Sequence, residues 1–166
     1  MQIDANADTA ALLDRLAKEA LPSESGLEAW RALLQAHATL IRRLEQDLAE
    51  KTGLALADFD VLAQLALAGG ELRMTDLAQR ALISRSGMTR RVARLVDQGL
   101  VRRAEAQGDA RTVVVALTDA GVARLTETAR VHLRGVAELF VAQLDEQQLA
   151  ALKNALDRVT VDCAFG

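Results

Sequence analysis

The chain has 166 residues, of which 51% are hydrophobic, 26% charged and 2% aromatic, with a formal net charge of −3 and a pI near 5.4. This length suits one domain with an aliphatic core, and the composition argues against a disordered chain. No apolar run approaches the roughly 20 residues of a membrane span, and the acidic start lacks the basic region of a secretory signal. Because Cys163 is the only cysteine, a disulfide framework is excluded and a reduced, cytoplasmic setting is expected.

The first part of the chain is predicted to be helical. A short helix is expected to stop at Pro22, and a longer one, with apolar residues at every third or fourth position, runs from Leu27 to Gly53. A third helix is predicted from about Ala57 to Ala68, where two glycines end it.

Two shorter helices are predicted next. The segment "MTDLAQRA" indicates a helix of about two turns with Thr75 as its cap. After a tight connection, Ser84 or Ser86 caps a second helix that runs to Asp97 and is closed by Gly99. A short helix, a turn of a few residues and a second helix form the helix-turn-helix pattern.

The periodicity changes after Gly99. The runs "LVRRAEA" and "RTVVVAL", separated by "QGDA", predict a two-stranded antiparallel hairpin. Thr118 then caps a long helix that reaches about Leu144, and a last helix ends near Val161. The predicted fold class is mainly α with a small β-hairpin wing, in which a winged helix-turn-helix is flanked by N- and C-terminal helices.

An arginine-rich stretch stands out in this acidic chain. The 28 residues Ser84–Arg111 hold seven arginines and three acids, a local net charge of +4, so the rest of the chain carries about −7. Such segregation creates a local field that attracts phosphate, whereas the alternative is a solvated helix face.

The helical spacing separates two faces of this motif. The residues expected to face the core are Leu77, Ala78, Met88, Val92 and Leu95. The residues expected to face outward are Arg85, Ser86, Thr89, Arg90 and Arg94. Arginine can donate two hydrogen bonds to guanine, serine and threonine hydroxyls reach bases or phosphates, and a helix N-terminus directs amides at phosphate oxygens.

We therefore predict a set of DNA-contacting residues. On the two helices the set comprises Thr75, Ser84, Arg85, Ser86, Thr89, Arg90, Arg91 and Arg94. For Arg91 and Arg103, packing or pairing with acids is the alternative. Arg111 lies at the hairpin tip, where an arginine fits a narrow minor groove.

The segment "LRMTDLAQRALISRSGMTRRVARLVDQGLVRR", followed by "GDARTVVVALTDAG", resembles the MarR (multiple antibiotic resistance regulator) family of winged-helix transcription factors. The resemblance extends from about Leu27 to Val159. It implies a homodimer in which residues 27–54 and 119–161 form dimerisation helices and residues 55–118 the DNA-binding region. Residues 1–26 form an extension with a short helix.

The family resemblance also implies roles at the wing. Each subunit would place Ser84–Asp97 in the major groove of double-stranded DNA, with Asp109 positioning the wing and Arg111 entering the minor groove. Many members have a second arginine where this chain has Ala110. The function implied is a sequence-specific transcriptional regulator, a ligand-relieved repressor that binds a pseudo-palindromic operator. The alternative is a winged-helix protein-interaction module that does not bind DNA.

Two further residues are candidates for an effector site. Trp30 and His37 lie seven residues apart on one helix face. They pack in the core or at the dimer interface, or they line a pocket for a small aromatic ligand, as the resemblance implies. His132 is expected to be a packing residue whose polar atoms are satisfied.

No enzyme, cofactor or metal is predicted. The chain has no Gly-rich phosphate loop, nucleophile elbow or H-E-x-x-H motif. Two histidines and one cysteine without paired spacing do not make a zinc site. A redox-sensing role is disfavoured for Cys163, because its nearest charges are mostly acidic and would not stabilise a thiolate.

Overall fold

The structure of the protein is a computed structural model that describes residues 5–21, 23–106 and 109–164. Within these ranges, the side chains of residues 5–11, 13, 105–106, 109–111 and 161–164 are not described. The chain divides into two compact units, residues 1–42 and 43–166. The first unit holds α1 (Ala5–Ala20) and the greater part of α2 (Glu24–Thr52), and α2 ends in the second unit.

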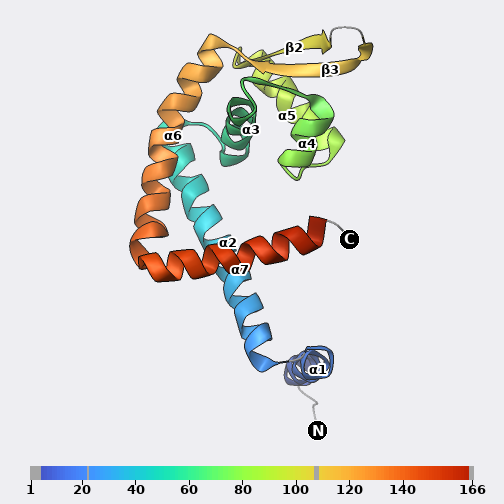
Figure 1. Cartoon of the computed structure of the whole chain (residues 1–166), viewed down its shortest axis with the longest axis vertical. Coiled ribbons are helices and arrows are strands. Elements are labelled where there is room, and N and C mark those ends of the chain that lie inside the picture. The colour runs from blue at the N-terminus through green and yellow to red at the C-terminus, as the bar shows by residue number, and fades with distance from the viewer. Residues whose placement is uncertain (1–4, 22, 107–108, 165–166) are drawn as a thin grey trace. The chain divides into compact units, whose positions relative to one another are not determined.

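The second unit is helical apart from a small sheet. Its elements after α2 are α3 (Leu56–Leu67), β1 (Glu71–Arg73), α4 (Met74–Arg80), α5 (Arg85–Asp97), β2 (Val101–Ala106), β3 (Asp109–Leu117), α6 (Asp119–Leu139), the 3-10 turn η1 (Val141–Gln143) and α7 (Glu146–Ala164). Helices α3, α4 and α5 lie on one side of the β2–β3 hairpin (Figure 1). The predicted class, mainly α with a β-hairpin wing, is confirmed.

The hairpin pairs with a third strand that the sequence did not predict. The antiparallel sheet has the order β1-β3-β2, with Leu72 and Arg103 both opposite Val115. Three residues are too few for an alternating pattern to show in the sequence. Because residues opposite one another in a sheet share a face, Arg103 lies on the face of buried Val115, and Arg102 lies on the other face.

The core of the second unit lies between α3, α4, α5 and the sheet. Leu77, Met88, Val92 and Leu95 have no exposed surface, and Ala78 is 6% exposed. The inward face predicted for the two helices is therefore confirmed. Full burial of a large aliphatic side chain contributes about 1.5–3 kcal/mol, so α5 is firmly seated on α4 and the strands.

Helix α4 begins earlier than predicted. Its N-cap is Arg73, the last residue of β1, and no side chain caps it. Thr75 lies within the first turn, and its hydroxyl donates to the Asp76 carboxylate at 3.2 Å. The prediction that Thr75 caps this helix was wrong, because the missed strand sets where the helix starts.

The N-cap of α6 is as predicted, whereas its C-terminal end is not. Thr118 Oγ1 accepts a hydrogen bond from the Gly121 amide at 3.0 Å and donates one to the Gly99 carbonyl at 2.6 Å. The helix ends at Leu139 instead of near Leu144, because η1 intervenes before α7. In the part of the chain that the structure describes, no helix has the length and apolar character needed to cross a bilayer.

Candidate nucleic-acid interface

The turn between α4 and α5 has a fixed geometry. Leu82 adopts a left-handed conformation with φ of 52°. The Ile83 amide donates to the Ala78 carbonyl at 3.0 Å, and the Leu82 amide donates to the Gln79 carbonyl at 3.2 Å. These bonds satisfy the free carbonyls at the end of α4 and set the direction in which α5 leaves the turn.

Of the two predicted caps, Ser84 and Ser86, it is Ser84 that caps α5. Its Oγ accepts a hydrogen bond from the Gly87 amide at 3.2 Å and lies 3.4 Å from Ser86 Oγ. A Cβ on Gly87 would lie 2.9 Å from Ile83 Cγ2, so this position favours glycine. The capped N-terminus leaves helix amides at an exposed end, which favours an anion there.

The outward face of α5 is polar and exposed, as predicted. The exposed residues are Arg85, Ser86, Thr89, Arg90 and Arg94. Thr89 Oγ1 donates to the Arg85 carbonyl at 2.9 Å, which leaves its oxygen lone pairs to accept. Among the described residues, Arg85 and Arg90 form no ion pair, so both guanidinium groups are available to a ligand in solvent.

Two other arginines of α5 bind a carboxylate on α3. Asp58 Oδ1 accepts from Arg91 Nη1 at 2.8 Å and from Arg94 Nη2 at 3.2 Å. Asp58 is 6% exposed. Arg91 therefore pairs with an acid, which was the alternative to DNA contact for this residue. The same carboxylate also binds Arg94.

Asp58 is a partner of these arginines that the sequence did not predict. A single acid in the first turn of α3, more than 30 residues before the arginines, gives no local pattern. Two further exposed arginines, Arg73 and Arg80, were not among the predicted contacts. They lie at the two ends of the helix that precedes the turn, and their proximity to the motif was the signal available.

Arg103 links the hairpin to α5. Its Nη2 donates to the Thr89 carbonyl at 3.1 Å, so packing is the alternative that the structure shows for this residue. Asp109 and Arg111 belong to β3 by their backbone, but their side chains lie outside the described residues. Their roles at the wing stay predictions.

His132 on α6 packs against α3. Its ring centroid lies 4.7 Å from that of Phe59, and its buried Nδ1 has no hydrogen-bond partner among the described residues. Burial lowers the pKa of His132 below its ordinary value, and the nearby Asp60 carboxylate opposes this shift. The expectation of a fully satisfied packing histidine was therefore wrong at Nδ1.

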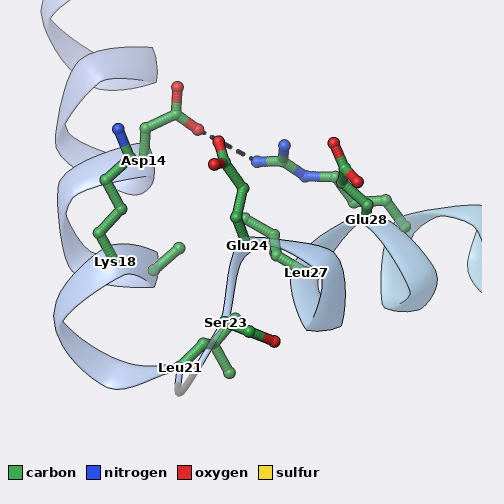
Figure 2. Close-up of a pocket in the computed structure, with 9 residues that line it drawn as sticks. Asp14, Lys18, Leu21, Ser23, Glu24, Leu27 and Glu28 are labelled. Atoms are coloured by element: carbon green, nitrogen blue, oxygen red, sulfur yellow. Dashed lines mark hydrogen bonds and ion pairs between the residues drawn. The ribbon is translucent and has the colours of Figure 1, made fainter.

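The first unit contains a hollow between α1 and the start of α2, with a volume of about 320 Å³. Figure 2 shows Asp14 and Lys18 on one side and Glu24 and Glu28 on the other, and Arg31 donates to Asp14 at 3.2 Å. The lining mixes both signs of charge and includes neither Trp30 nor His37. Both of these residues are exposed, so packing within the unit does not account for them.

Among the described side chains, no group of three or more His, Cys, Asp or Glu is arranged to hold a metal ion. The observed features are a helix-turn-helix with a buried inner face and a cationic outer face, followed by a β-hairpin tied to the second helix. They define a winged helix-turn-helix protein. Residues 52–112 match the sequence pattern of the MarR family. The chain belongs to the MarR family.

Relatives and solved structures agree with this assignment. The HTH-type transcriptional regulator PecS of Dickeya dadantii (strain 3937) is 29% identical over 122 residues, which cover 72% of this chain and 73% of PecS. AbsC, a MarR family transcriptional regulator of Streptomyces coelicolor, has a TM-score of 0.80 and 27% identity, covering 88% of this chain and 99% of AbsC. Sco3205 of the same organism, solved in complex with DNA, has a TM-score of 0.78 and 30% identity, covering 84% and 92% of the two chains.

Proposed function

We propose that this protein is a transcriptional regulator that binds double-stranded DNA with α5 in the major groove. The observation that carries the proposal is the exposed pair Arg85 and Arg90 on a helix whose other face is buried and whose N-terminus is capped. Sco3205, which shares 30% identity, was solved with DNA, and this supports the same use of the fold.

The residues of the interface would divide into two roles. Arg85 and Arg90 donate paired hydrogen bonds to guanine, while Thr89 and Ser86 contact neighbouring base edges. Ser84, Thr75 and the α5 N-terminus contact phosphates, and these contacts fix the register on the duplex. Asp109 and Arg111 are the remaining positions proposed at the interface, whereas Arg91 and Arg94, which the sequence predicts there, are paired with Asp58.

The regulatory scheme is a proposal at a finer level. A homodimer would bind a pseudo-palindromic operator whose half-sites lie about one helical turn, roughly 34 Å, apart. Occupancy would repress the promoter by excluding polymerase. A small aromatic effector, bound near Trp30 and His37, would relieve repression if it binds the form with wrongly spaced recognition helices more tightly.

The test is a binding titration with a promoter fragment at several salt concentrations. Wild type should bind more weakly as salt rises, because phosphate contacts release counterions. Arg90→Ala should weaken operator binding by about 1–3 kcal/mol.

Arg90→Lys is the matched variant, because it keeps the charge and loses the two-pronged donor geometry. It should retain the salt dependence and lose discrimination between the operator and a scrambled sequence. Wild-type binding that is absent, or insensitive to salt, would favour the alternative of a protein-interaction module.

A further inference from the structure

Asp58 presents to α5 the chemistry that a DNA phosphate would present. Its buried carboxylate accepts hydrogen bonds from two arginines of this helix, Arg91 and Arg94. Guanidinium groups bind carboxylate and phosphate oxygens with similar geometry and charge assistance. An arginine that is engaged by Asp58 is therefore not free to neutralise a phosphate with the same nitrogen atoms.

The two ion pairs differ in their exposure. The Arg91 side chain is 23% exposed and lies 2.8 Å from Asp58 Oδ1, whereas the Arg94 side chain is 54% exposed and lies 3.2 Å from it. A mostly buried charge is costly to unpair, so Arg91 serves as the anchor. Arg94 is half-exposed, so it is the arginine that loss of the Asp58 charge would release to a phosphate in solvent.

Arg94 lies where it can reach a phosphate once it is released. It follows Arg90 by four residues, so the two arginines are neighbours on the exposed stripe of α5. If Arg90 reaches the major groove, Arg94 lies one helical turn further along the same helix, within the field of the flanking phosphates.

We propose that Asp58 withholds Arg94 from DNA phosphates and thereby lowers binding to DNA of arbitrary sequence. This inference rests on the proposed function and adds Asp58, which is not among the residues proposed to contact DNA, as a residue that sets the affinity for DNA of arbitrary sequence. Phosphate contacts carry affinity without sequence information, whereas base contacts carry the discrimination. Holding back one cation lowers affinity for all sequences, so binding depends more on Arg85 and Arg90.

The proposal predicts a measurable change in salt dependence. Each added phosphate contact steepens the plot of log affinity against log salt by about 0.9. Asp58→Asn removes the charge and keeps an oxygen that can accept from Arg91. Its affinity for a random-sequence duplex should rise, and between 50 and 200 mM salt it should fall by about 3.5-fold more than that of wild type.

The control is Asp60→Asn, which removes the same charge from the same helix. Asp60 forms no ion pair among the described residues, so this variant should keep the wild-type slope. In the Asp58→Asn background, Arg94→Gln should return the slope of log affinity against log salt to its wild-type value. In the wild-type background, Arg94→Gln should change this slope by less. Near-ultraviolet circular dichroism and thermal unfolding would verify that each variant is folded.

The outcomes separate this inference from the proposed function. If wild type binds the promoter with salt dependence but Asp58→Asn leaves the slope unchanged, the inference is overturned and the proposed function stands. The inference also fails if the steepening persists in the double variant, or appears equally in Asp60→Asn. If Asp58→Asn does not fold, the single variant Arg94→Gln tests the inference. A slope reduced by about 0.9 relative to wild type would show that Arg94 already contacts a phosphate and is not withheld. Absence of DNA binding by wild type overturns both.

Discussion

His132 shows how one buried atom makes stability depend on pH. Its Nδ1 is buried with no partner in the part of the chain that the structure describes, and burial holds the pKa of the ring below its ordinary value of about 6.5. The folded state therefore favours the neutral ring. Above about pH 6.5 the ring is neutral in both the folded and the unfolded chain. As the pH falls below this value, the ring binds a proton in the unfolded chain before it does so in the folded chain.

We therefore expect the free energy of unfolding to fall as the pH is lowered from about 6.5 toward the lower folded pKa, and His132→Gln should reduce this dependence. Urea unfolding at pH 7.5, 6.5 and 5.5 would measure it. The matched control is His37→Gln, at the exposed histidine of α2. An identical pH slope in wild type and His132→Gln would show that burial of this ring is not the cause.

At the scale of residues, the sequence could show which face of α5 is exposed but not what the exposed arginines bind. The spacing of Met88, Val92 and Leu95 fixes the inward face, and the structure confirms it. The pairing of Arg91 and Arg94 with Asp58 depends on how α3 crosses α5, which is a tertiary relation. A pattern within one helix carries no information about that crossing.

Among the helices, the cap of α5 gives a direct test of how this element is held. Ser84 Oγ accepts from the Gly87 amide at 3.2 Å, whereas Ser86 lies inside the helix. Ser84→Ala should lower the free energy of unfolding by about 1 kcal/mol, and Ser86→Ala should change it much less. Denaturant titration would measure both, and equal losses would contradict the assignment of Ser84 as the cap.

Two glycines of α6 test how closely this helix approaches its neighbours. A Cβ on Gly121 would lie 2.0 Å from the Leu100 carbonyl oxygen, whereas a Cβ on Gly135 would meet the Leu44 Cδ2 methyl at 2.7 Å. Backbone cannot move aside as a methyl group can. Gly121→Ala should therefore cost at least about 1–3 kcal/mol, while in Gly135→Ala the gain in helix propensity, about 1 kcal/mol, offsets much of the strain.

Thermal unfolding of the two glycine variants would rank them. A Gly121→Ala protein as stable as wild type would mean that the N-terminus of α6 can move away from the Leu100 carbonyl. A Gly135→Ala protein that is the less stable of the two would mean that Leu44 cannot rotate.

The elements themselves were predictable where local chemistry defines them. Helix caps at Ser84 and Thr118 and the glycines after α3 and α5 mark boundaries that the structure confirms within a few residues. Strand β1 could not be predicted, because its three residues form a strand only by pairing with β3, more than 40 residues later. The end of α6 was predicted too late in the chain, because η1 interrupts a helical sequence pattern that continues into α7.

At the scale of the molecule, each of the two units leaves large apolar side chains exposed on helices outside the helix-turn-helix. In the first unit Trp30 is 55% and Leu34 48% exposed, and in the second Leu133 is 63% and Val159 58% exposed. Exposed apolar side chains in such numbers are typical of protein interfaces, and a symmetric dimer buries the same residues on both copies. These residues support the proposed homodimer.

Leu133→Glu should therefore shift the protein from twice its chain mass of 17.9 kDa toward the monomer, because a carboxylate would be buried without a partner. Leu82→Glu is the control, because Leu82 is 93% exposed but lies in the turn of the helix-turn-helix. Sedimentation equilibrium should find it still dimeric. A monomer also loses the gain from binding two half-sites at once, so Leu133→Glu should bind the operator hardly better than an isolated half-site. If Leu133→Glu stays dimeric, this face of α6 is not the interface, and if it is monomeric yet binds the operator like wild type, the two-fold scheme fails.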